Sequence, residues 1–527
     1  MHFDVLIQRG NVYDGRGDAA QRVDIGIVGR SITAIGALEA SSAKVVLDAD
    51  GLAVAPGFID THTHSDVAAF QDERHLALRA ASVLQGVTTA ISGNCGFSPF
   101  PFVPEHRADL ESQSAVVFGQ VRERWDGLTA YRDAIERRGL LSNIAPLIGH
   151  GALRAGIAGN GREISPNDKE AMNAALATAL ADGAYGLSTG LIYAPGMFAD
   201  RDELIDLART AARAGRPYVS HIRGESVSLF DALDEALAIG RRSGASVHIS
   251  HHKAAGRDNW GRTSETLQRI DAARSSGIDV WLDVYPYVYG STLLSALLPP
   301  WVHIGGVSSL VARLGDSSVR QRIADELSDE GWENMARAAG WDGILIASCP
   351  GDPDVEGRSI AEIADLRHRE APDVVFDLLV AQRGAVMMNV RLMSEPDVRN
   401  VLRHPNSMIG SDGIPLPGKP HPRLAGTFAR VLGRYVREER VLDLSIAIKK
   451  MTSMPAGRFS LRGRGELVVG ASADVVVFDP ATVLDLATFE DPLAPPRGIR
   501  DVLLNGAVVV RNGLLTGTRP GEVLTPN

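Results

Sequence analysis

Short apolar runs separated by glycine and aspartate occupy both ends of the chain. Near the N-terminus their β-branched residues predict strands at 5–9, 24–28, 31–35 and 44–47. Near the C-terminus, residues 474–478 and 502–504 have the same pattern, and Asn505-Gly506 is a dipeptide that type I′ hairpins favour. Because each half is too small to be stable alone, we expect the two halves to pair into one small β-sandwich.

The middle of the chain alternates apolar stretches with segments of helical periodicity. Residues 202–214, for example, place apolar side chains at helical spacing and end at Gly215, a residue suited to a helix C-terminus. Such alternation predicts β-α units and a parallel sheet. The candidate strands are residues 52–59, 88–92, 143–148, 185–188, 217–220, 247–250, 280–284 and 408–411. Eight parallel strands are the number that closes a (β/α)8 barrel.

These patterns divide the chain into an α/β barrel and a smaller β unit. We predict a TIM-type (β/α)8 barrel over residues 55–460 and a β-sandwich built from residues 1–54 and 461–527. The stretch after the seventh strand, about 286–407, is too long for one connection. We therefore expect an insertion with its own helices, beside or over the mouth of the barrel.

The composition of the chain bears on its binding partners and on the cellular compartment in which we expect it. The chain has 527 residues and a formal charge of −10, without the clustered basic surface that a nucleic acid or an anionic membrane attracts. No apolar run is long enough to span a bilayer, and the N-terminus lacks the pattern of a signal peptide. The two cysteines, Cys95 and Cys349, are poor material for a disulfide framework. We expect a cytoplasmic protein with neither a nucleic-acid nor a membrane partner.

The residues that bind metals best follow the predicted strands. A TIM barrel carries its active site at the carboxyl ends of its strands. The residues found there are His62 and His64 after the first strand, Cys95 after the second, His221 after the fifth, His251 after the sixth and Asp412 after the eighth. Alternation along an extended chain turns His62 and His64 to the same side. Zinc accepts nitrogen and sulfur ligands together, so these residues predict a zinc site.

Each of these residues also has an ordinary structural interpretation. A lone histidine is more often a hydrogen-bonded core or surface residue, and Cys95 alone is more often a small buried apolar residue. Asp412, in a Ser-Asp-Gly turn, has the residue type that caps a following helix. Their convergence at one end of the barrel favours the metal site. We choose His251 over His252 because His251 is nearer to the end of its strand.

A zinc site with a nearby carboxylate predicts hydrolysis. Zinc lowers the pKa of bound water from about 15.7 to about 7 and polarises a carbonyl oxygen. A carboxylate beside that water takes its proton and later delivers it to the leaving nitrogen. Asp412 is our candidate for this general base and acid.

Eight short motifs resemble the amidohydrolase superfamily, and most closely its N-acyl-D-amino-acid deacylase (D-aminoacylase) family. They are APGFIDTHTH (55–64), SGNCG (92–96), GLSTGLIY (186–193), SHIR (220–223), ISHHK (249–253), YPY (285–287), GST (290–292) and IGSDG (409–413). The cysteine after the second strand is the specific feature, because many relatives bridge their metals with a carboxylated lysine from the fourth strand. The fourth predicted strand here is followed by Thr189-Gly190 and has no lysine.

The resemblance implies ligands and substrate contacts. A tightly held zinc takes Cys95, His221 and His251, with water in the open fourth position. A second, weaker site uses His62, His64, a bridging Cys95 and Asp412. A substrate carboxylate near the metal is held by basic and hydroxyl groups, for which the candidates are Lys253, Tyr193, Tyr287 and Ser291; barrel packing is the alternative for the two tyrosines.

The predicted activity is zinc-dependent hydrolysis of N-acyl-D-amino acids to a carboxylate and a free D-amino acid, with metal-bound water as the nucleophile. The partner is then a small-molecule N-acyl amino acid, and the apolar segment 293–301 favours hydrophobic side chains if it faces the mouth. The preference for D over L substrates comes from the resemblance alone. One alternative is a cyclic-amide hydrolase of the dihydroorotase or hydantoinase kind, against which Cys95 and the missing lysine count. The other is a non-catalytic scaffold, which usually loses metal ligands that this chain retains.

Overall fold

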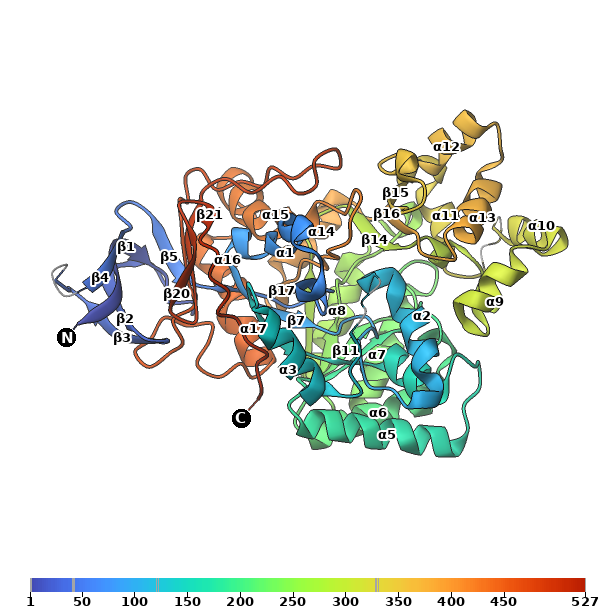
Figure 1. Cartoon of the computed structure of the whole chain (residues 1–527), viewed down its shortest axis with the longest axis horizontal. Helices are drawn as coiled ribbons and strands as arrows, with labels where there is room; N and C mark the ends of the chain where they lie inside the picture. The colour runs from blue at the N-terminus through green and yellow to red at the C-terminus, as the bar shows by residue number, and fades with distance from the viewer. Residues whose placement is uncertain are drawn as a thin grey trace.

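A computed structural model describes residues 2–39, 43–119, 121, 123–327, 329 and 331–526. A sheet made from both ends of the chain lies on one side, the barrel lies in the middle, and helices α9 to α13 lie on the far side (Figure 1). In the described part of the chain, no helix has both the length and the apolar character needed to cross a membrane.

The central unit is a barrel of parallel strands. The strands are β6 (Phe58–Asp60), β7 (Val87–Ser92), β8 (Asn143–Pro146), β9 (Ile148–Gly149), β10 (Leu187–Gly190), β11 (Tyr218–His221), β12 (Val247–Ile249), β13 (Val280–Val284) and β17 (Ser407–Ile409). They pair in the orders β6-β7-β8 and β17-β13-β12-β11-β10-β9. β8 and β9 are two segments of one strand separated by Leu147, whose N–H donates to the Ser92 carbonyl at 2.9 Å. The Asp412 N–H donates to the His62 carbonyl at 2.7 Å and joins the last strand to the first. The predicted (β/α)8 barrel is confirmed.

Helices cover the outside of these strands. They are α1 (Leu76–Ala80), α2 (Arg107–Phe118), α3 (Leu128–Arg138), α4 (His150–Leu153), α5 (Pro166–Ala181), α6 (Arg201–Arg213), α7 (Leu229–Ser243), α8 (Thr263–Ser275), α14 (Glu395–Arg403), α15 (Arg423–Arg430), α16 (Leu444–Met451) and α17 (Ser453–Arg458). Helix α6 shows why the sequence forms them: the Asp200 side chain caps its N-terminus by accepting from Glu203 N–H at 2.7 Å. Its leucines and isoleucine lie on the buried side. Because helices and barrel interior bury both faces, every residue of β7 and β10 is buried.

The two chain ends form one sheet. Its strands are β1 (Phe3–Val12), β2 (Gln21–Val28), β3 (Ser31–Gly36), β4 (Ala43–Asp48), β5 (Ala53–Pro56), β18 (Val475–Phe478), β19 (Ile499–Leu504), β20 (Ala507–Arg511) and β21 (Leu514–Leu515). The antiparallel pair β5–β18 joins the two halves. Asn505 and Gly506, with φ of +50° and +83°, turn the chain from β19 into β20, as a type I′ hairpin requires. Apolar side chains from both halves share one core cluster.

The insertion follows β13. It contains an antiparallel sheet, β14 (Tyr289–Leu293), β16 (Met387–Arg391) and β15 (Ile344–Ser348), with α9 (Gly306–Arg313), α10 (Ser317–Glu326), α11 (Met335–Ala339), α12 (Ile360–Arg367) and α13 (Ala371–Ala381). Helix α14 instead packs against α8, β13 and β17, so it belongs to the ring around the barrel. The expected insertion, about 286–407, therefore includes one barrel helix. The domain boundaries at 54/55 and 460/461 stay predictions.

Candidate metal centre

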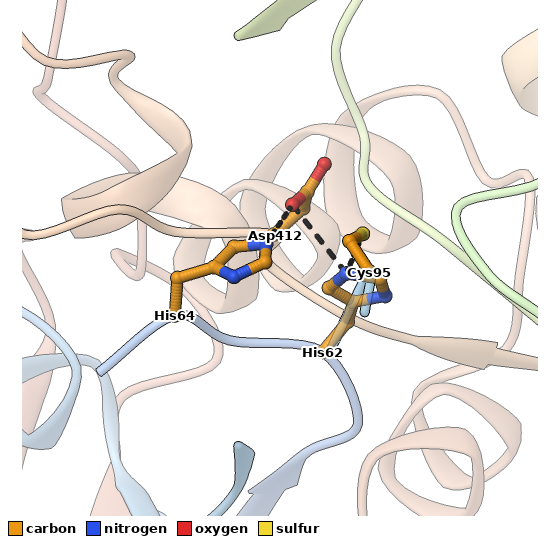
Figure 2. A group of neighbouring side chains, drawn as sticks. All are labelled: His62, His64, Cys95 and Asp412. Atoms are coloured by element: carbon orange, nitrogen blue, oxygen red, sulfur yellow. Dashed lines mark hydrogen bonds and ion pairs between the residues drawn. The ribbon is translucent and has the colours of Figure 1, made fainter. Parts of the chain in front are cut away.

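Two groups of buried side chains meet at the carboxyl ends of the barrel strands. The first ligand group is Cys95, His221 and His251, and the second is His62, His64, Cys95 and Asp412; within each group the ligand atoms lie within 4.8 Å of one another. In Figure 2 the side chains of the second group converge on one point, with His62 and His64 on the same segment. Sequence reasoning assigned these same residues to a metal site, and the fold brings all of them together.

Backbone geometry at the strand ends aims three of these side chains. Cys95, His251 and Asp412 have φ of +52°, +34° and +51°, in the left-handed region that non-glycine residues rarely adopt. Such conformations cost about 1–3 kcal/mol each and persist where the surrounding structure fixes them. Their clustering at one site indicates that the fold accepts local strain in order to direct the ligands inward.

The first ligand group has the spacing of a tetrahedral zinc site. Cys95 Sγ lies 3.6 Å from His221 Nδ1 and 3.5 Å from His251 Nε2. Around a tetrahedral zinc, with bonds of about 2.3 Å to sulfur and about 2.0 Å to nitrogen, these atoms are about 3.5 Å apart. The donor set and its spacing therefore fit the metal without rearrangement.

The second ligand group is packed at similar distances. His62 Nε2 lies 3.2 Å from Cys95 Sγ and 3.5 Å from Asp412 Oδ1, and His64 Nε2 lies 3.2 Å from the same carboxylate oxygen. Because Cys95 belongs to both groups, its thiolate is placed to bridge two ions. The residues can thus hold one metal ion or two.

Charge within the cluster sets the protonation of the ligands. Burial alone would raise the pKa of the Cys95 thiol, but the charges of His62 and His251 hold it well below its ordinary value. Burial lowers the pKa of His221. Burial also opposes protonation of His64, yet its hydrogen bonds to Asp412 and Cys95 raise its pKa to about 9. Cys95 is therefore a thiolate, the form that binds metals.

An acidic residue that sequence reasoning missed lies behind the first ligand group. Glu225 Oε1 is 3.2 Å from His251 Nδ1, 3.8 Å from His221 Nε2 and 2.5 Å from Lys253 Nζ. A carboxylate at the outer nitrogen of a ligating histidine fixes the orientation of the ring. The only signal in the sequence was the position of Glu225 on the loop that begins at His221.

Asp283, near the end of β13, has a comparable position behind His62. Its Oδ2 lies 3.6 Å from His62 Nδ1 and 2.6 Å from His248 Nε2, while its Oδ1 accepts from His251 N–H at 2.9 Å. Asp283 therefore connects the two ligand groups through the barrel interior.

Arg423 is a second residue that sequence reasoning missed. Its Nη2 lies 2.9 Å from Asp412 Oδ2, and its side chain is fully buried. Burial alone would raise the pKa of Asp412, but the Arg423 guanidinium and the nearby histidines hold it well below its ordinary value. Arg423 Nε and Nη1 have no hydrogen-bond partner among the described residues. The ion pair with the Arg423 guanidinium thus stabilises the charged form of Asp412.

A cavity lies beside the candidate metal ligands, and three of the four predicted substrate-binding residues line it. Tyr193, Lys253 and Ser291 line it, together with Tyr285 and an apolar wall. That wall consists of Val117, Ile192, Leu293, Met335, Met387, Val390, Leu392 and Ile414. Leu293 is the member of the segment 293–301 that faces this cavity.

Of the two tyrosines in the YPY motif, the structure places Tyr285 and not Tyr287 at the cavity. Tyr287 does not line the cavity; its ring packs against His421 and Arg430. The reason is a turn at Pro286, where Tyr287 N–H donates to the Tyr285 carbonyl at 3.0 Å. Tyr285 faces the cavity in its place, beneath Lys253 and Arg423.

His252 turns away from the ligands. Its Nε2 lies 2.7 Å from Thr266 Oγ1, on helix α8. The structure thus places His251, and not its neighbour, beside Cys95.

Comparison with known proteins identifies the protein family to which this chain belongs. The sequence matches the model of an amidohydrolase family over residues 45–510. The chain therefore belongs to the amidohydrolase family, and it is a hydrolase.

The full-length relatives narrow the class to deacylases. The chain is 40% identical to N-acyl-D-glutamate deacylase of Alcaligenes xylosoxydans xylosoxydans over 99% of this chain and 96% of that protein. It is 38% identical to D-aminoacylase of the same organism over 99% of this chain and 97% of that protein. The resemblance to N-acyl-D-amino-acid deacylases is thus confirmed.

Solved structures agree with this placement. The structure of N-acyl-D-glutamate deacylase from Bordetella bronchiseptica, complexed with zinc and a phosphonate inhibitor, is 36% identical, with a TM-score of 0.85 over 100% of both chains. A D-aminoacylase structure with a binuclear metal centre is also 36% identical, with a TM-score of 0.85 over 99% of this chain and 100% of that one. A D-hydantoinase is 17% identical, with a TM-score of 0.56 over 99% and 98%, and so shares the fold alone.

Proposed function

We propose that this enzyme hydrolyses N-acyl-D-amino acids to a carboxylate and a free D-amino acid, with zinc bound by Cys95, His221 and His251. The observation that carries the proposal is the meeting of this thiolate-histidine group with Asp412 at one cavity, where Arg423 pairs with the Asp412 carboxylate. The full-length similarity to D-aminoacylase and N-acyl-D-glutamate deacylase supports the substrate class.

Zinc is supported by the mixed sulfur and nitrogen donors and by the zinc in the related deacylase structure. We assign the tighter position to the first ligand group and a weaker position to the second. When bound, zinc lowers the pKa of a coordinated water to about 7 and polarises the amide carbonyl.

Asp412 supplies the proton transfers. Burial opposes the charge of Asp412, but Arg423 and the histidines keep it ionised at neutral pH, so the carboxylate is in the form that can accept a proton from the attacking water. The same carboxyl group then returns the proton to the amide nitrogen as the C–N bond breaks, which releases the D-amino acid as a neutral amine leaving group. Arg423 holds the Asp412 carboxylate in place through Oδ2 and leaves Oδ1 toward the ligands.

The substrate carboxylate is assigned to the polar side of the cavity. Lys253, Ser291 and Tyr193, which line the cavity, remain our candidates, and we add Tyr285, which lines it as well. Lys253 and Arg423 both lie over the Tyr285 ring, with Nζ at 5.6 Å and Cζ at 4.6 Å from its centre. We assign the substrate carboxylate to Lys253, because it is the cation of this pair that lines the cavity.

The remaining wall favours an apolar substrate side chain. Apart from the histidines, Lys253 is the only basic side chain among the described residues that line the cavity, and Glu225 already pairs with it. A second substrate carboxylate, as in N-acyl-D-glutamate, has no free cation there. We therefore propose leucine-like or methionine-like side chains rather than acidic ones.

The test is a screen of zinc-loaded enzyme with paired N-acetyl-D- and N-acetyl-L-amino acids. We expect cleavage of N-acetyl-D-leucine and N-acetyl-D-methionine, no cleavage of their L forms, and kcat/KM for N-acetyl-D-glutamate lower by at least about tenfold, the size of effect that an unpaired buried charge produces. Opening of hydantoin rings without cleavage of N-acetyl-D-leucine would establish the cyclic-amide alternative. Absence of bound zinc in protein purified without chelator would support the scaffold alternative.

A further inference from the structure

The loop of residues 224–228, between β11 and α7, connects the first ligand group with the insertion. On its inner side, Glu225 reaches His251, His221 and Lys253. Its position therefore determines how firmly a carboxylate stands behind the metal ligands. Nothing within the loop itself is a regular helix or strand.

The outer side of this loop is held by Glu333, which belongs to the insertion. Glu333 Oε2 accepts from Glu225 N–H at 3.1 Å, from Ser226 N–H at 2.9 Å and from Ser226 Oγ at 2.6 Å. Glu333 Oε1 accepts from Ser228 N–H at 2.8 Å and Ser228 Oγ at 2.6 Å. Both carboxylate oxygens are thus committed to one short loop by charge-assisted hydrogen bonds.

The close approach of the Glu333 carboxylate to the loop depends on Gly224, which has no side chain. A Cβ atom at Gly224 would lie 2.3 Å from Glu333 Oε1 and 1.9 Å from Ser228 Oγ, so a larger residue would exclude the carboxylate. On the insertion side, Asn334 caps helix α11 by accepting from Arg337 N–H at 3.0 Å, and Met335 lines the substrate cavity. The segment that anchors the loop therefore also forms part of the cavity wall.

We infer that Glu333 is a positioning residue for the metal centre and acts through Glu225. Without the Glu333 carboxylate, three backbone N–H groups and two hydroxyls of the loop lose their acceptor. The loop then loses the anchor that, together with the Lys253–Glu225 ion pair, holds Glu225 beside His251. The insertion is then part of the metal site as well as a cover for it. This inference rests on the zinc site proposed above.

The test is a double-mutant cycle on zinc affinity, measured by competition with a chromogenic chelator. Loss of an outer carboxylate typically weakens metal binding about 10–100-fold, which we expect for Glu225→Ala. We expect Glu333→Ala to weaken zinc binding by about tenfold, toward the low end of that range, because it acts one step further out. If Glu333 acts through Glu225, the double variant binds zinc within about twofold of Glu225→Ala alone.

Glu362→Ala is the matched control. Glu362 is another insertion carboxylate, and it accepts from Ser359 N–H at 2.7 Å and Ser359 Oγ at 3.0 Å at the start of α12. Its loss disturbs the insertion without touching the loop of residues 224–228. We expect its zinc affinity to equal that of the wild type, even where thermal unfolding shows a lower Tm.

Three results would overturn the inference. The first is wild-type zinc affinity in Glu333→Ala, and the second is a double variant whose loss equals the product of the two single losses. If Glu333→Ala does not fold, the double variant Ser226→Ala/Ser228→Ala removes two hydroxyl donors and keeps the carboxylate. The third contradicting result is wild-type zinc affinity in that double variant. Wild-type protein that binds no zinc rejects the proposed function itself, whereas a zinc-binding wild type with equally tight variants rejects only this inference.

Discussion

The first and second ligand groups share Cys95 but differ in what stands behind their histidines. In the first group, the outer nitrogens of His251 and His221 face the same carboxylate, Glu225, at 3.2 and 3.8 Å. In the second, His62 Nδ1 lies 3.6 Å from Asp283; among the described residues, the outer nitrogens of His62 and His64, like that of His221 in the first group, make no hydrogen bond. Because an outer partner fixes the ring of a ligating histidine, the first group is better prepared for a metal.

The two ligand groups also differ in the pKa values of their histidines. Metal binding requires neutral imidazole, so every protonated ligand must first release a proton. In the first group, burial lowers the pKa of His221; for His251, burial and the charge of Lys253 oppose protonation, but Cys95 and Glu225 raise its pKa above the ordinary value. Burial also opposes the charged form of His62, yet Cys95, Asp412 and Asp283 raise its pKa well above the ordinary value, and the pKa of His64 rises to about 9. The comparison teaches that two sites with similar ligand spacing can differ in affinity through protons and outer contacts alone.

The largest expected effect comes from removing the shared ligand. Cys95→Ala takes the thiolate from both groups, and we expect loss of bound zinc together with loss of deacylase activity. Metal content after dialysis, measured by atomic emission, checks this. Cys349→Ala is the control, because burial raises the pKa of that thiol to about 11 and it lies in the insertion. A full equivalent of zinc in Cys95→Ala would contradict the ligand assignment.

The next effect separates catalysis from metal binding. Asp412→Asn removes the proton acceptor but leaves Cys95, His221 and His251 intact, so we expect one retained zinc and kcat lower by about 10²–10⁴-fold, the usual contribution of a general base. Zinc content and kcat are measured on the same preparation. A zinc-loaded variant with near wild-type kcat would show that the assignment of Asp412 is wrong.

The sequence carried most of the fold and both ligand groups because their signals are local. Period-two alternation, buried apolar runs and capping residues define the strands and α6 directly. His62, Cys95 and Asp412 follow such strands within a few residues, so the barrel topology alone determines that they meet. The location in the cell stays a prediction.

The missing residues depend on contacts that no local pattern encodes. Arg423 reaches Asp412 from helix α15, and Glu333 reaches the loop after β11 from the insertion, more than a hundred residues further along the chain. Tyr287, a candidate from the resemblance, lies outside the cavity because the chain turns at Pro286, as its packing alternative allowed. Arg423 lies only eleven residues beyond Asp412, so that contact depends on the turn into α15, whereas the contact of Glu333 depends on packing between distant segments. One sequence alone specifies neither.

A smaller change tests the carboxylate behind the first group. Glu225→Gln keeps the size of the side chain but removes the charge that faces His251 and pairs with Lys253. We expect zinc affinity lower by about tenfold, at the low end of the effect of losing an outer partner. Chelator competition measures it, with Glu265→Gln on the exposed side of α8 as the control. Equal zinc affinity in Glu225→Gln and Glu265→Gln would show that the Glu225 carboxylate does not support zinc binding by the first ligand group.

The smallest effect on the tight metal is expected at His64. His64→Asn removes a ligand of the second group alone, so affinity for the first zinc should stay within about threefold of the wild type, while the second equivalent is lost. Since the pKa of His64 is about 9, this residue is protonated at pH 7 in the metal-free enzyme and must lose that proton when the second ion binds. The variant should therefore release about two protons fewer on saturation with zinc, one from His64 and one from His62, which no longer binds a second ion. His75→Asn, outside the site, should release as many as the wild type. Calorimetry in two buffers of different ionisation enthalpy counts these protons. Unchanged proton release with two zinc equivalents retained would mean that His64 does not bind the second metal, and the contrast between the two groups would then rest on His62 and Asp412 alone.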